Sequence, residues 1–405
     1  MTDPLRPSTN ALRFAFAFGF IADIGMFIHA GWVKGLMAWA ALGILVLVSM
    51  GWISGGIARI PEATQRRILV AGAILTAAVV AVLYPLANAQ VIPGMHERDE
   101  LIKGGLGYLF SGRNPYEFQL GARAPISPFP TWLILNIPFY LLGKLSPHDA
   151  LYGLQNIAAL VVVYLLWRRV IGTSMTTYAL FLLALSLALP NIAYELIAGS
   201  DYLADGVMVT AMATTAIFAS ERVAANRWLM VLTGFAFVSR LHFGLLFAPI
   251  AGYYLGTVGF RETVRRLTWM AGPAALVALA FWAIEPSRFM PIHTSNYLGE
   301  WEGATAQFDA ALHFNTSFIV DASVTMLTVA VLTFLSYRKA RATATMLAEV
   351  AIVGTPILVA FITNSIRHGE VYLGPFSSHS LAVVILLAAA VALAPYGSRA
   401  DQLAH

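Results

Sequence analysis

Apolar stretches about as long as a membrane is thick recur from one end of this chain to the other. The hydrocarbon core of a bilayer is about 30 Å thick, so about 20 mainly apolar residues in a helix can cross it. Only 11% of the residues are charged and 59% are hydrophobic, whereas soluble domains carry about 25% charged residues. The sequence therefore predicts an all-α polytopic membrane protein.

Clusters of Lys and Arg between the apolar stretches predict the orientation, because such clusters collect on the cytoplasmic side. The N-terminal stretch continues without a small-residue cleavage site, so we expect a span there and not a cleaved signal. The pattern predicts about twelve crossings with both ends cytoplasmic. The expected spans are residues 12–32, 36–53, 68–89, 151–167, 178–194, 203–219, 228–255 as two short helices, 267–284, 319–337, 348–362 and 376–394.

Two segments depart from simple crossings. Residues 129–142 are apolar but short and contain Pro130 and Pro138, so we predict a re-entrant or interface helix. A full crossing there would put Arg168 and Arg169 on the wrong side of the membrane. Residues 228–255 contain Arg240 and His242, and splitting this stretch at Arg240 keeps the later arginines cytoplasmic.

We expect one transmembrane domain over residues 1–405, with two large extracytoplasmic loops at residues 90–147 and 285–316. Cysteine is absent, which excludes disulfides and thiolate metal sites. The net charge of +4 follows from basic residues at helix ends, and no nucleic-acid-binding motif is present. We therefore expect membrane lipid, and no nucleic acid, as a partner.

The most unusual polar segment is residues 96–116, which read HERDELIKGGLGYLFSGRNPY. It begins with five consecutive ionisable side chains. Apolar residues then recur at helical spacing, so residues 99–111 are predicted to form an amphipathic juxtamembrane helix. A carboxylate cluster that opens such a helix is a candidate site for chemistry.

The predicted topology brings further polar residues to the extracytoplasmic ends of helices. Ionisable residues embedded in apolar helices are energetically expensive, so they are candidates for function by default. The structural alternatives are local ion pairs in a solvated loop and arginines that reach the membrane interface. The residues concerned are Asp99, Glu195, Asp201, Arg240, His242, His293, Arg367 and His368.

The first loop resembles the GT-C superfamily of membrane glycosyltransferases, in its mannosyltransferase-like branch. Asp99 stands 13 residues before Gly112, and residues 112–116, GRNPY, match a Gly-x-x-Pro-Tyr type of turn. The proline-rich residues 125–132, the turn at 199–201 and the basic residue in 238–240 resemble later parts of the pattern. The resemblance implies a GT-C-like bundle of about twelve transmembrane helices and a donor that is a polyprenyl-phosphate sugar.

The same resemblance implies roles for individual residues. Asp99, or alternatively Glu97, would accept the proton of the attacking hydroxyl group. The donor phosphate would need cations or hydrogen-bond donors, for which the candidates are Arg240, His242, Arg367 and His293. Candidates for contact with the acceptor or sugar are Glu195, Asp201, Tyr116 and Trp301. Glu195 and Asp201 could alternatively hold a divalent cation, but two loop acids do not make a metal site, so neither a metal nor another cofactor is expected.

The expected function is an inverting transfer of a hexose, of mannose type, to a lipid-linked or cell-envelope glycan. The active site would face the periplasm from a bacterial inner membrane. One alternative is a transporter or flippase for a lipid-linked saccharide, although no second broken helix matches the one at Arg240. The other is a glycan polymerase or ligase that is centred on residues 285–316.

Overall fold

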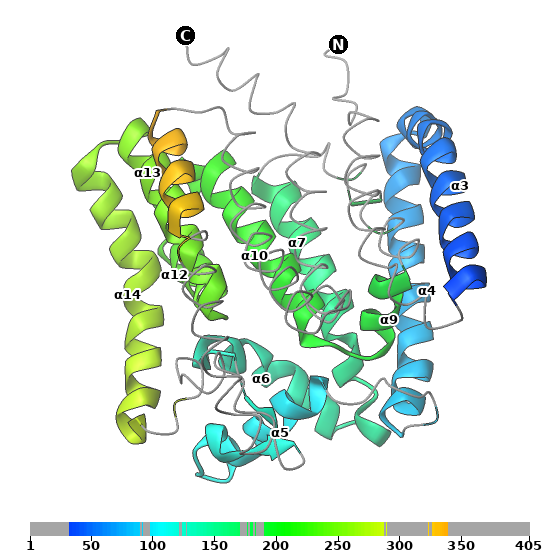
Figure 1. Ribbon diagram of the computed structural model, residues 1–405, viewed down its shortest axis with the longest axis horizontal. Helices are drawn as coiled ribbons and strands as arrows, with labels where there is room; N and C mark the ends of the chain where they lie inside the picture. The colour runs from blue at the N-terminus through cyan, green and yellow to red at the C-terminus, as the bar shows by residue number, and fades with distance from the viewer. Residues whose placement is uncertain are drawn as a thin grey trace.

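The computed structural model describes residues 32–89, 98–120, 124–126, 128–170, 190–286 and 326–338, together with residues 91, 176, 179–180, 183, 289 and 323. These parts are almost entirely helical (Figure 1). Within these described ranges, three helical segments are long and apolar enough to cross a membrane: Glu62–Asn88, Pro147–Arg169 and Phe260–Ile284. The prediction of a helical membrane protein is confirmed in this coarse form. The number of about twelve crossings stays a prediction, because several expected spans lie outside the described residues.

The described elements are helices, apart from two short strands. One two-stranded antiparallel ribbon pairs Gln119 with Pro125 and Leu120 with Ala124. The elements are α3 (Trp32–Arg59), α4 (Glu62–Asn88), α5 (Arg98–Phe110), η1 (Pro115–Glu117), β1 (Gln119–Leu120), β2 (Ala124–Pro125), α6 (Pro130–Lys144), η2 (Pro147–Asp149), η3 (Tyr152–Leu154), α7 (Gln155–Val170), α9 (Pro190–Ile197), α10 (Asp201–Phe218), α11 (Ser220–Ala225), α12 (Arg227–Phe237), η4 (Leu241–Leu246), α13 (Phe247–Thr257) and α14 (Phe260–Ile284).

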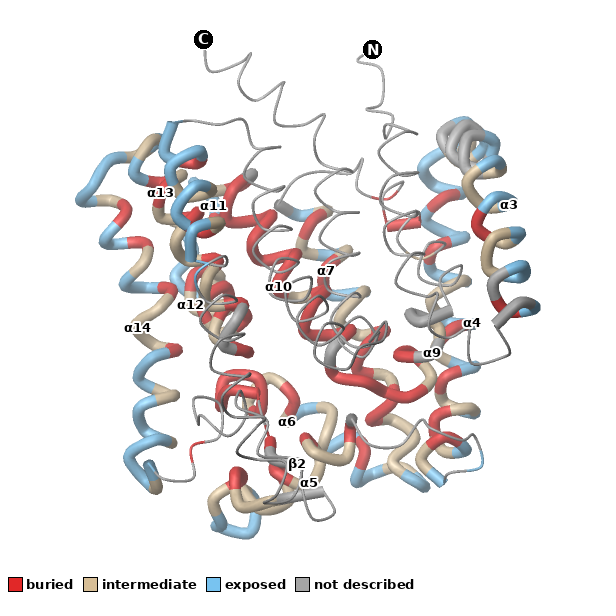
Figure 2. The backbone as a smooth tube through the Cα atoms, viewed as in Figure 1, coloured by how far each residue is buried: buried red, intermediate tan, exposed pale blue. Residues whose placement is uncertain are grey.

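Helix α10 lies at the centre of the bundle and is buried along most of its length (Figure 2). Its apolar and small residues pack against α7 and α12. The hydroxyl of Thr210 donates a hydrogen bond to the backbone carbonyl of Gly206 at 2.7 Å, so this buried polar group is satisfied within the helix. By contrast, α3, α4 and α14 expose large apolar side chains, such as Trp52, Ile74 and Leu276. Apolar surface of this extent fits contact with lipid.

Helices α5 and α6 lie together at one end of the bundle (Figure 1). Helix α5 matches the amphipathic helix predicted for residues 99–111 within one residue at each end. Helix α6 has 15 residues, so it is about 22 Å long and shorter than the hydrocarbon core. This agrees with the prediction that residues 129–142 do not make a full crossing.

The predicted break in residues 228–255 is present. Helix α12 ends at Phe237, Arg240 has an extended backbone, and a 3-10 turn leads into α13. The backbone N–H of Phe129 donates to the carbonyl of Ser239 at 2.8 Å. This hydrogen bond attaches the break to the start of α6 and places Arg240 at the same end of the bundle as α5.

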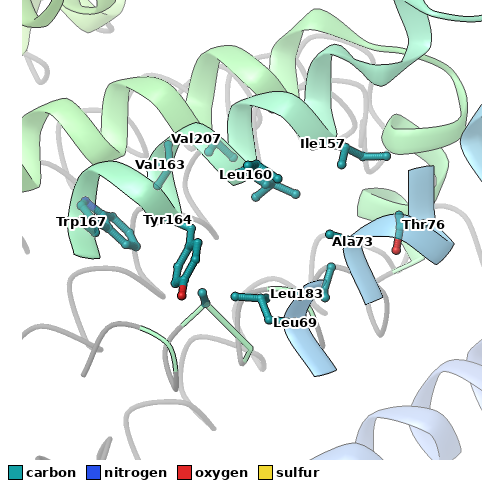
Figure 3. Close-up of a pocket in the computed structure, with 12 residues that line it drawn as sticks. Leu69, Ala73, Thr76, Ile157, Leu160, Val163, Tyr164, Trp167, Leu183 and Val207 are labelled. Atoms are coloured by element: carbon teal, nitrogen blue, oxygen red, sulfur yellow. The ribbon is translucent and has the colours of Figure 1, made fainter. Parts of the chain in front are cut away.

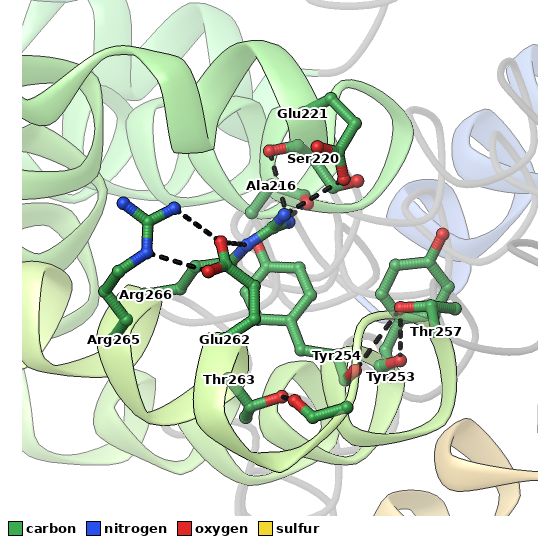
Figure 4. Close-up of polar contacts among 11 residues, drawn as sticks. Ala216, Ser220, Glu221, Tyr253, Tyr254, Thr257, Glu262, Thr263, Arg265 and Arg266 are labelled. Atoms are coloured by element: carbon green, nitrogen blue, oxygen red, sulfur yellow. Dashed lines mark hydrogen bonds and ion pairs between the residues drawn. The ribbon is translucent and has the colours of Figure 1, made fainter.

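The opposite end of the bundle is held by a cluster of ion pairs (Figure 4). Arg266 Nη2 lies 2.9 Å from Glu221 Oε1, and Arg266 Nε lies 2.8 Å from Glu262 Oε1. Glu262 also pairs with Arg265 at 2.6 Å. The hydroxyl of Tyr254 donates to the carbonyl of Ala216 at 2.9 Å. Together these contacts tie α10, α11, α13 and α14 to one another.

Helices α12 and α14 approach each other closely at Gly234. A Cβ atom added to Gly234 would lie 1.7 Å from the carbonyl oxygen of Met270. Small residues at such crossings let helix backbones in membranes come into contact. A glycine is therefore required at this position, and the contact sets how α14 lies against the bundle.

Candidate functional site

The first turn of α5 places Asp99 against α4. The Asp99 side chain is buried, with 1% of the residue exposed. Lys103 Nζ lies 2.8 Å from Asp99 Oδ2, one helical turn further along α5. The hydroxyl of Tyr84, near the end of α4, donates a hydrogen bond to the same carboxylate oxygen. Asp99 is thus held by one cation and one hydroxyl group.

Lys103 is the cation of this group and keeps some access to solvent, with 13% of its side chain exposed. Its ammonium also lies 3.0 Å from Tyr84 Oη, 3.2 Å from Asn88 Oδ1 and 3.6 Å from Asp149 Oδ2. It lies 5.6 Å from the ring centroids of both Tyr84 and Tyr152. Lys103 therefore lies between two carboxylates and two aromatic faces.

Burial raises the pKa of Asp99 above its ordinary value, because an apolar environment disfavours the charged carboxylate. Lys103 and the hydroxyl of Tyr84 act in the opposite direction and partly offset this effect. A carboxylate with a raised pKa is a better proton acceptor than an ordinary aspartate. The geometry and the charge of Asp99 therefore fit a general base.

A second charged cluster surrounds Arg240. Arg240 Nη2 lies 2.6 Å from Asp201 Oδ2, and Arg240 Nε lies 2.8 Å from Asp205 Oδ2. The indole N–H of Trp132 donates to Asp201 Oδ2 at 2.9 Å. All three charged residues are at least 95% buried. One guanidinium group thus forms ion pairs with two carboxylates. Removing any one of these charges would leave a buried charge without its partner, which is strongly destabilising.

Tyr84 connects the two clusters. Its ring fills the space beside Gly153 and Gly199, where an added Cβ atom would lie 2.5 Å from the ring in both cases. Gly199 has a φ of +65°, which favours glycine, and its carbonyl accepts a 2.5 Å hydrogen bond from Gln155 Nε2. The turn that leads into Asp201 therefore packs on the same tyrosine that bonds Asp99.

Several buried polar atoms lie around this turn. The hydroxyl of Tyr152, Oε1 of Gln155, Oδ1 of Asn156 and Oγ of Ser200 have no hydrogen-bond partner in the part of the chain that the structure describes. Buried polar atoms usually have a partner, from protein or from water. The surroundings of the turn can therefore accept water or the hydroxyl groups of a ligand.

Two further predicted site residues have mainly structural contacts. Glu195 is buried in α9, and its backbone carbonyl accepts from Ser200 N at 3.1 Å and from Asn156 Nδ2 at 3.3 Å. Tyr116 is buried beneath α5, and its hydroxyl donates to Pro128 O at 3.0 Å. Burial raises the pKa of Tyr116 well above its ordinary value. In this state the hydroxyl of Tyr116 is engaged by the protein itself.

Other candidates cannot be placed in the site. Glu97, His293, Trp301, Arg367 and His368 lie outside the described residues, and for His242 only the backbone in η4 is described. Within the described ranges, no three His, Cys, Asp or Glu side chains gather as a metal ion would need.

The structure adds residues that the sequence analysis did not single out: Tyr84, Lys103, Asp149 and Asp205. Two of them had a local signal, since Lys103 follows Asp99 by four residues and Asp205 follows Asp201 by four, a spacing that pairs side chains on a helix. Tyr84 and Asp149 had no such signal, because their contacts depend on the packing of α4 and η2 against α5.

Comparison of the chain with protein-family models, with curated proteins and with solved structures found no match. The two charged clusters and the turn between them are therefore the features that indicate a function.

Proposed function

We propose that the chain is an integral-membrane glycosyltransferase of GT-C type, which transfers a hexose from a polyprenyl-phosphate sugar to a lipid-linked or cell-envelope glycan. The observation that carries the proposal is the buried Asp99 carboxylate at the start of the amphipathic helix α5, bonded to Lys103 and Tyr84. The proposed location is the outer face of a bacterial inner membrane.

The reaction in this proposal is a single displacement at the anomeric carbon. The acceptor hydroxyl oxygen forms a bond to that carbon while its proton passes to Asp99. The bond between the anomeric carbon and the phosphate oxygen breaks, and the polyprenyl phosphate leaves with the electron pair. A raised pKa of Asp99 favours the proton transfer, and inversion of the anomeric centre follows from the single step.

The leaving phosphate needs a positive group at the membrane interface. Lys103 suits this role, because it is beside Asp99 and its side chain is 13% exposed. The guanidinium group of Arg240 pairs with Asp201 and Asp205 and only 5% of the residue is exposed, so Arg240 is less accessible to a phosphate than Lys103. In this proposal Arg240 positions the start of α10, while His242, His293 and Arg367 remain expected phosphate contacts.

The acceptor would lie against the turn before α10. Ser200, Gln155 and Tyr152 offer polar atoms there without partners among the described residues. Asp201 accepts from Trp132 and Arg240, which keeps its carboxylate in place beside the turn. Such a set of donors and acceptors is suited to the hydroxyl groups of a sugar.

The test is sugar transfer by the purified chain in liposomes, with radiolabelled polyprenyl-phosphate hexoses and a lipid extract of cell envelopes as acceptor. The Asp99→Asn variant should lose transfer by about 100-fold or more, because the amide cannot accept the proton. Glu117→Gln is the matched control, since this carboxylate pairs with the exposed Arg113 at 3.1 Å and belongs to neither buried cluster. Transfer near the wild-type rate by a folded Asp99→Asn protein would contradict the proposal.

A second candidate function is transport of a lipid-linked saccharide. The observation that favours it is the buried cluster of Asp201, Asp205 and Arg240, since charged groups inside a membrane protein often mark a transport path. Movement of a fluorescent lipid-linked saccharide between leaflets, without any transfer of labelled sugar, would support transport and reject the transferase.

A further inference from the structure

A cavity lies between α4, α7 and α10, and Ala179 and Leu183 also line it (Figure 3). Its walls include Leu69, Ala73, Leu160, Tyr164, Trp167 and Val207. The walls are mostly apolar and carry three polar groups, of which Trp167 Nε1 has no hydrogen-bond partner among the described residues and the other two are bonded. Thr76 Oγ1 donates to Gly72 O at 2.8 Å, and the hydroxyl of Tyr164 lies 3.3 Å from Thr176 Oγ1. The cavity therefore suits hydrocarbon and not a sugar.

The dimensions of the cavity fit part of one lipid chain. Its walls run along α7 from Ile157 to Trp167, a length of about 15 Å, which is about half the thickness of the hydrocarbon core. Its volume is about 70 Å³, about half that of a cavity that binds benzene. It can therefore hold a few carbons of a chain, while the rest of the chain lies along the open side between the helices.

Two arginines lie on the wall helices α4 and α7, close to one end of the cavity. Arg66 precedes Leu69 by three residues on α4, and Arg168 follows Tyr164 by four residues on α7. Residues at these spacings lie on the same face of a helix. Helix α4 begins and helix α7 ends at the side of the bundle opposite α5 and α6 (Figure 1). Arg66 thus lies one turn before the wall residue Leu69, and Arg168 directly follows the wall residue Trp167, so both arginines lie at the end of the cavity away from α5 and α6.

Neither arginine is neutralised within the described part of the chain. Arg66 is exposed and Arg168 is half-buried, and no ion pair joins either of them to a described residue. By contrast, Arg266 at the same end of the bundle is held by two glutamates. Arg66 and Arg168 can therefore form ion pairs with a bound anion. The positive charge at this end of the cavity complements the negative charge of a phosphate.

We infer that this cavity binds an anionic phospholipid of the leaflet at the Arg66 end, with one acyl chain between α4 and α7 and the phosphate between Arg66 and Arg168. Cationic side chains at the membrane surface attract anionic lipid headgroups. The apolar walls supply the affinity for the chain, and the two arginines supply the preference for a charged headgroup. The inference does not depend on the proposed glycosyltransferase activity, whose site lies at the other end of the bundle.

The test uses Trp167, which lines the cavity, as a reporter. The full chain is placed in nanodiscs of phosphatidylcholine, and phosphatidylglycerol with brominated acyl chains, which quench tryptophan fluorescence, is added. The chain has nine tryptophans, so the signal of Trp167 is the difference between wild type and the Trp167→Phe variant. We expect saturable quenching of this component by brominated phosphatidylglycerol.

Variants separate the contributions of the headgroup and the chain. Arg66→Gln and Arg168→Gln should each weaken binding by about fivefold. Arg261→Gln is the matched control, because Arg261 is an exposed arginine at the same end of the bundle, in the first turn of α14. Ala73→Phe should reduce quenching by filling the cavity. If Ala73→Phe does not fold, the Arg66→Gln and Arg168→Gln variants still decide the question.

Three results would overturn the inference. The first is quenching of the Trp167 component to the same extent by brominated phosphatidylcholine. The second is unchanged affinity when both Arg66 and Arg168 are replaced. The third concerns competition with brominated phosphatidylglycerol. If polyprenyl phosphate displaces it at a lower concentration than unlabelled phosphatidylglycerol does, the preferred ligand of the cavity is polyprenyl phosphate.

Discussion

Lys103 Nζ lies 2.8 Å from Asp99 Oδ2 on successive turns of α5, and Tyr84 of α4 donates to the same carboxylate oxygen. This ion pair is the centre of the proposed site. It keeps the Asp99 side chain from being an isolated buried charge, and it places a partly exposed cation beside the proposed base. Each function of the pair can be tested separately.

Replacing Lys103 should change the pH dependence of sugar transfer. Lys103 lowers the pKa of Asp99, so the Lys103→Gln variant should have a still higher pKa at Asp99. The base works only when deprotonated, so the acidic limb of the pH profile of kcat/KM should move to higher pH. An acidic limb at the wild-type position would show that Asp99 is not the titrating base. Lys144→Gln is a control on the neighbouring helix α6.

The raised pKa of Asp99 should also affect stability. The ordinary pKa is 3.8, and in the folded chain the value is higher, so the native state binds more protons than the unfolded state above pH 3.8. The contribution of Asp99 to the free energy of unfolding therefore falls as the pH rises from 3.8 to the raised value. Thermal unfolding of wild type should show this fall, and the Asp99→Asn variant should show less of it. Parallel pH profiles for the two proteins would contradict the expectation.

Removing the charge of Arg240 should destabilise the bundle. Arg240→Met leaves the carboxylates of Asp201 and Asp205 buried without a cation, which costs about 3–5 kcal/mol when a buried pair is broken in this way. The triple variant Arg240→Met, Asp201→Asn, Asp205→Asn should recover part of the loss, because no unpaired charge remains. The measurement is the unfolding temperature in a single detergent. A single variant as stable as wild type would show that the cluster does not hold the helices.

The close contact of α12 and α14 predicts a strong effect at Gly234. Gly234→Val should lower stability by about 3 kcal/mol, because its Cβ atom would overlap the carbonyl of Met270. Gly272→Ala is the matched control on α14, where an added Cβ atom meets nothing within 4 Å among the placed atoms. Alanine there should be neutral or stabilising by up to about 1 kcal/mol, since it favours the helix. Equal unfolding temperatures for the two variants would contradict this account of the crossing.

Most of the helical elements could be predicted from the chain alone. The apolar stretches at residues 36–53, 68–89, 203–219 and 267–284 lie in α3, α4, α10 and α14, and the amphipathic pattern at residues 99–111 forms α5. The break at Arg240 was also predicted. These features depend on the length of an apolar stretch and on helical periodicity, which are local properties of the sequence.

The partners of the charged residues were decided by tertiary structure. A phosphate contact of Arg240 stays a prediction, and the partners that the fold gives Arg240 are Asp205 and Asp201, which lie 35 and 39 residues earlier in the chain. Tyr84 reaches Asp99 across 15 residues, because the end of α4 packs against α5. Composition and spacing determined that this is a helical membrane protein and singled out Asp99, Asp201 and Arg240 as candidate functional residues. The pairing of individual carboxylates with individual cations was decided only by the packing of the helices. A buried charge must be paired, and its partner is a charged group that a neighbouring helix places within reach.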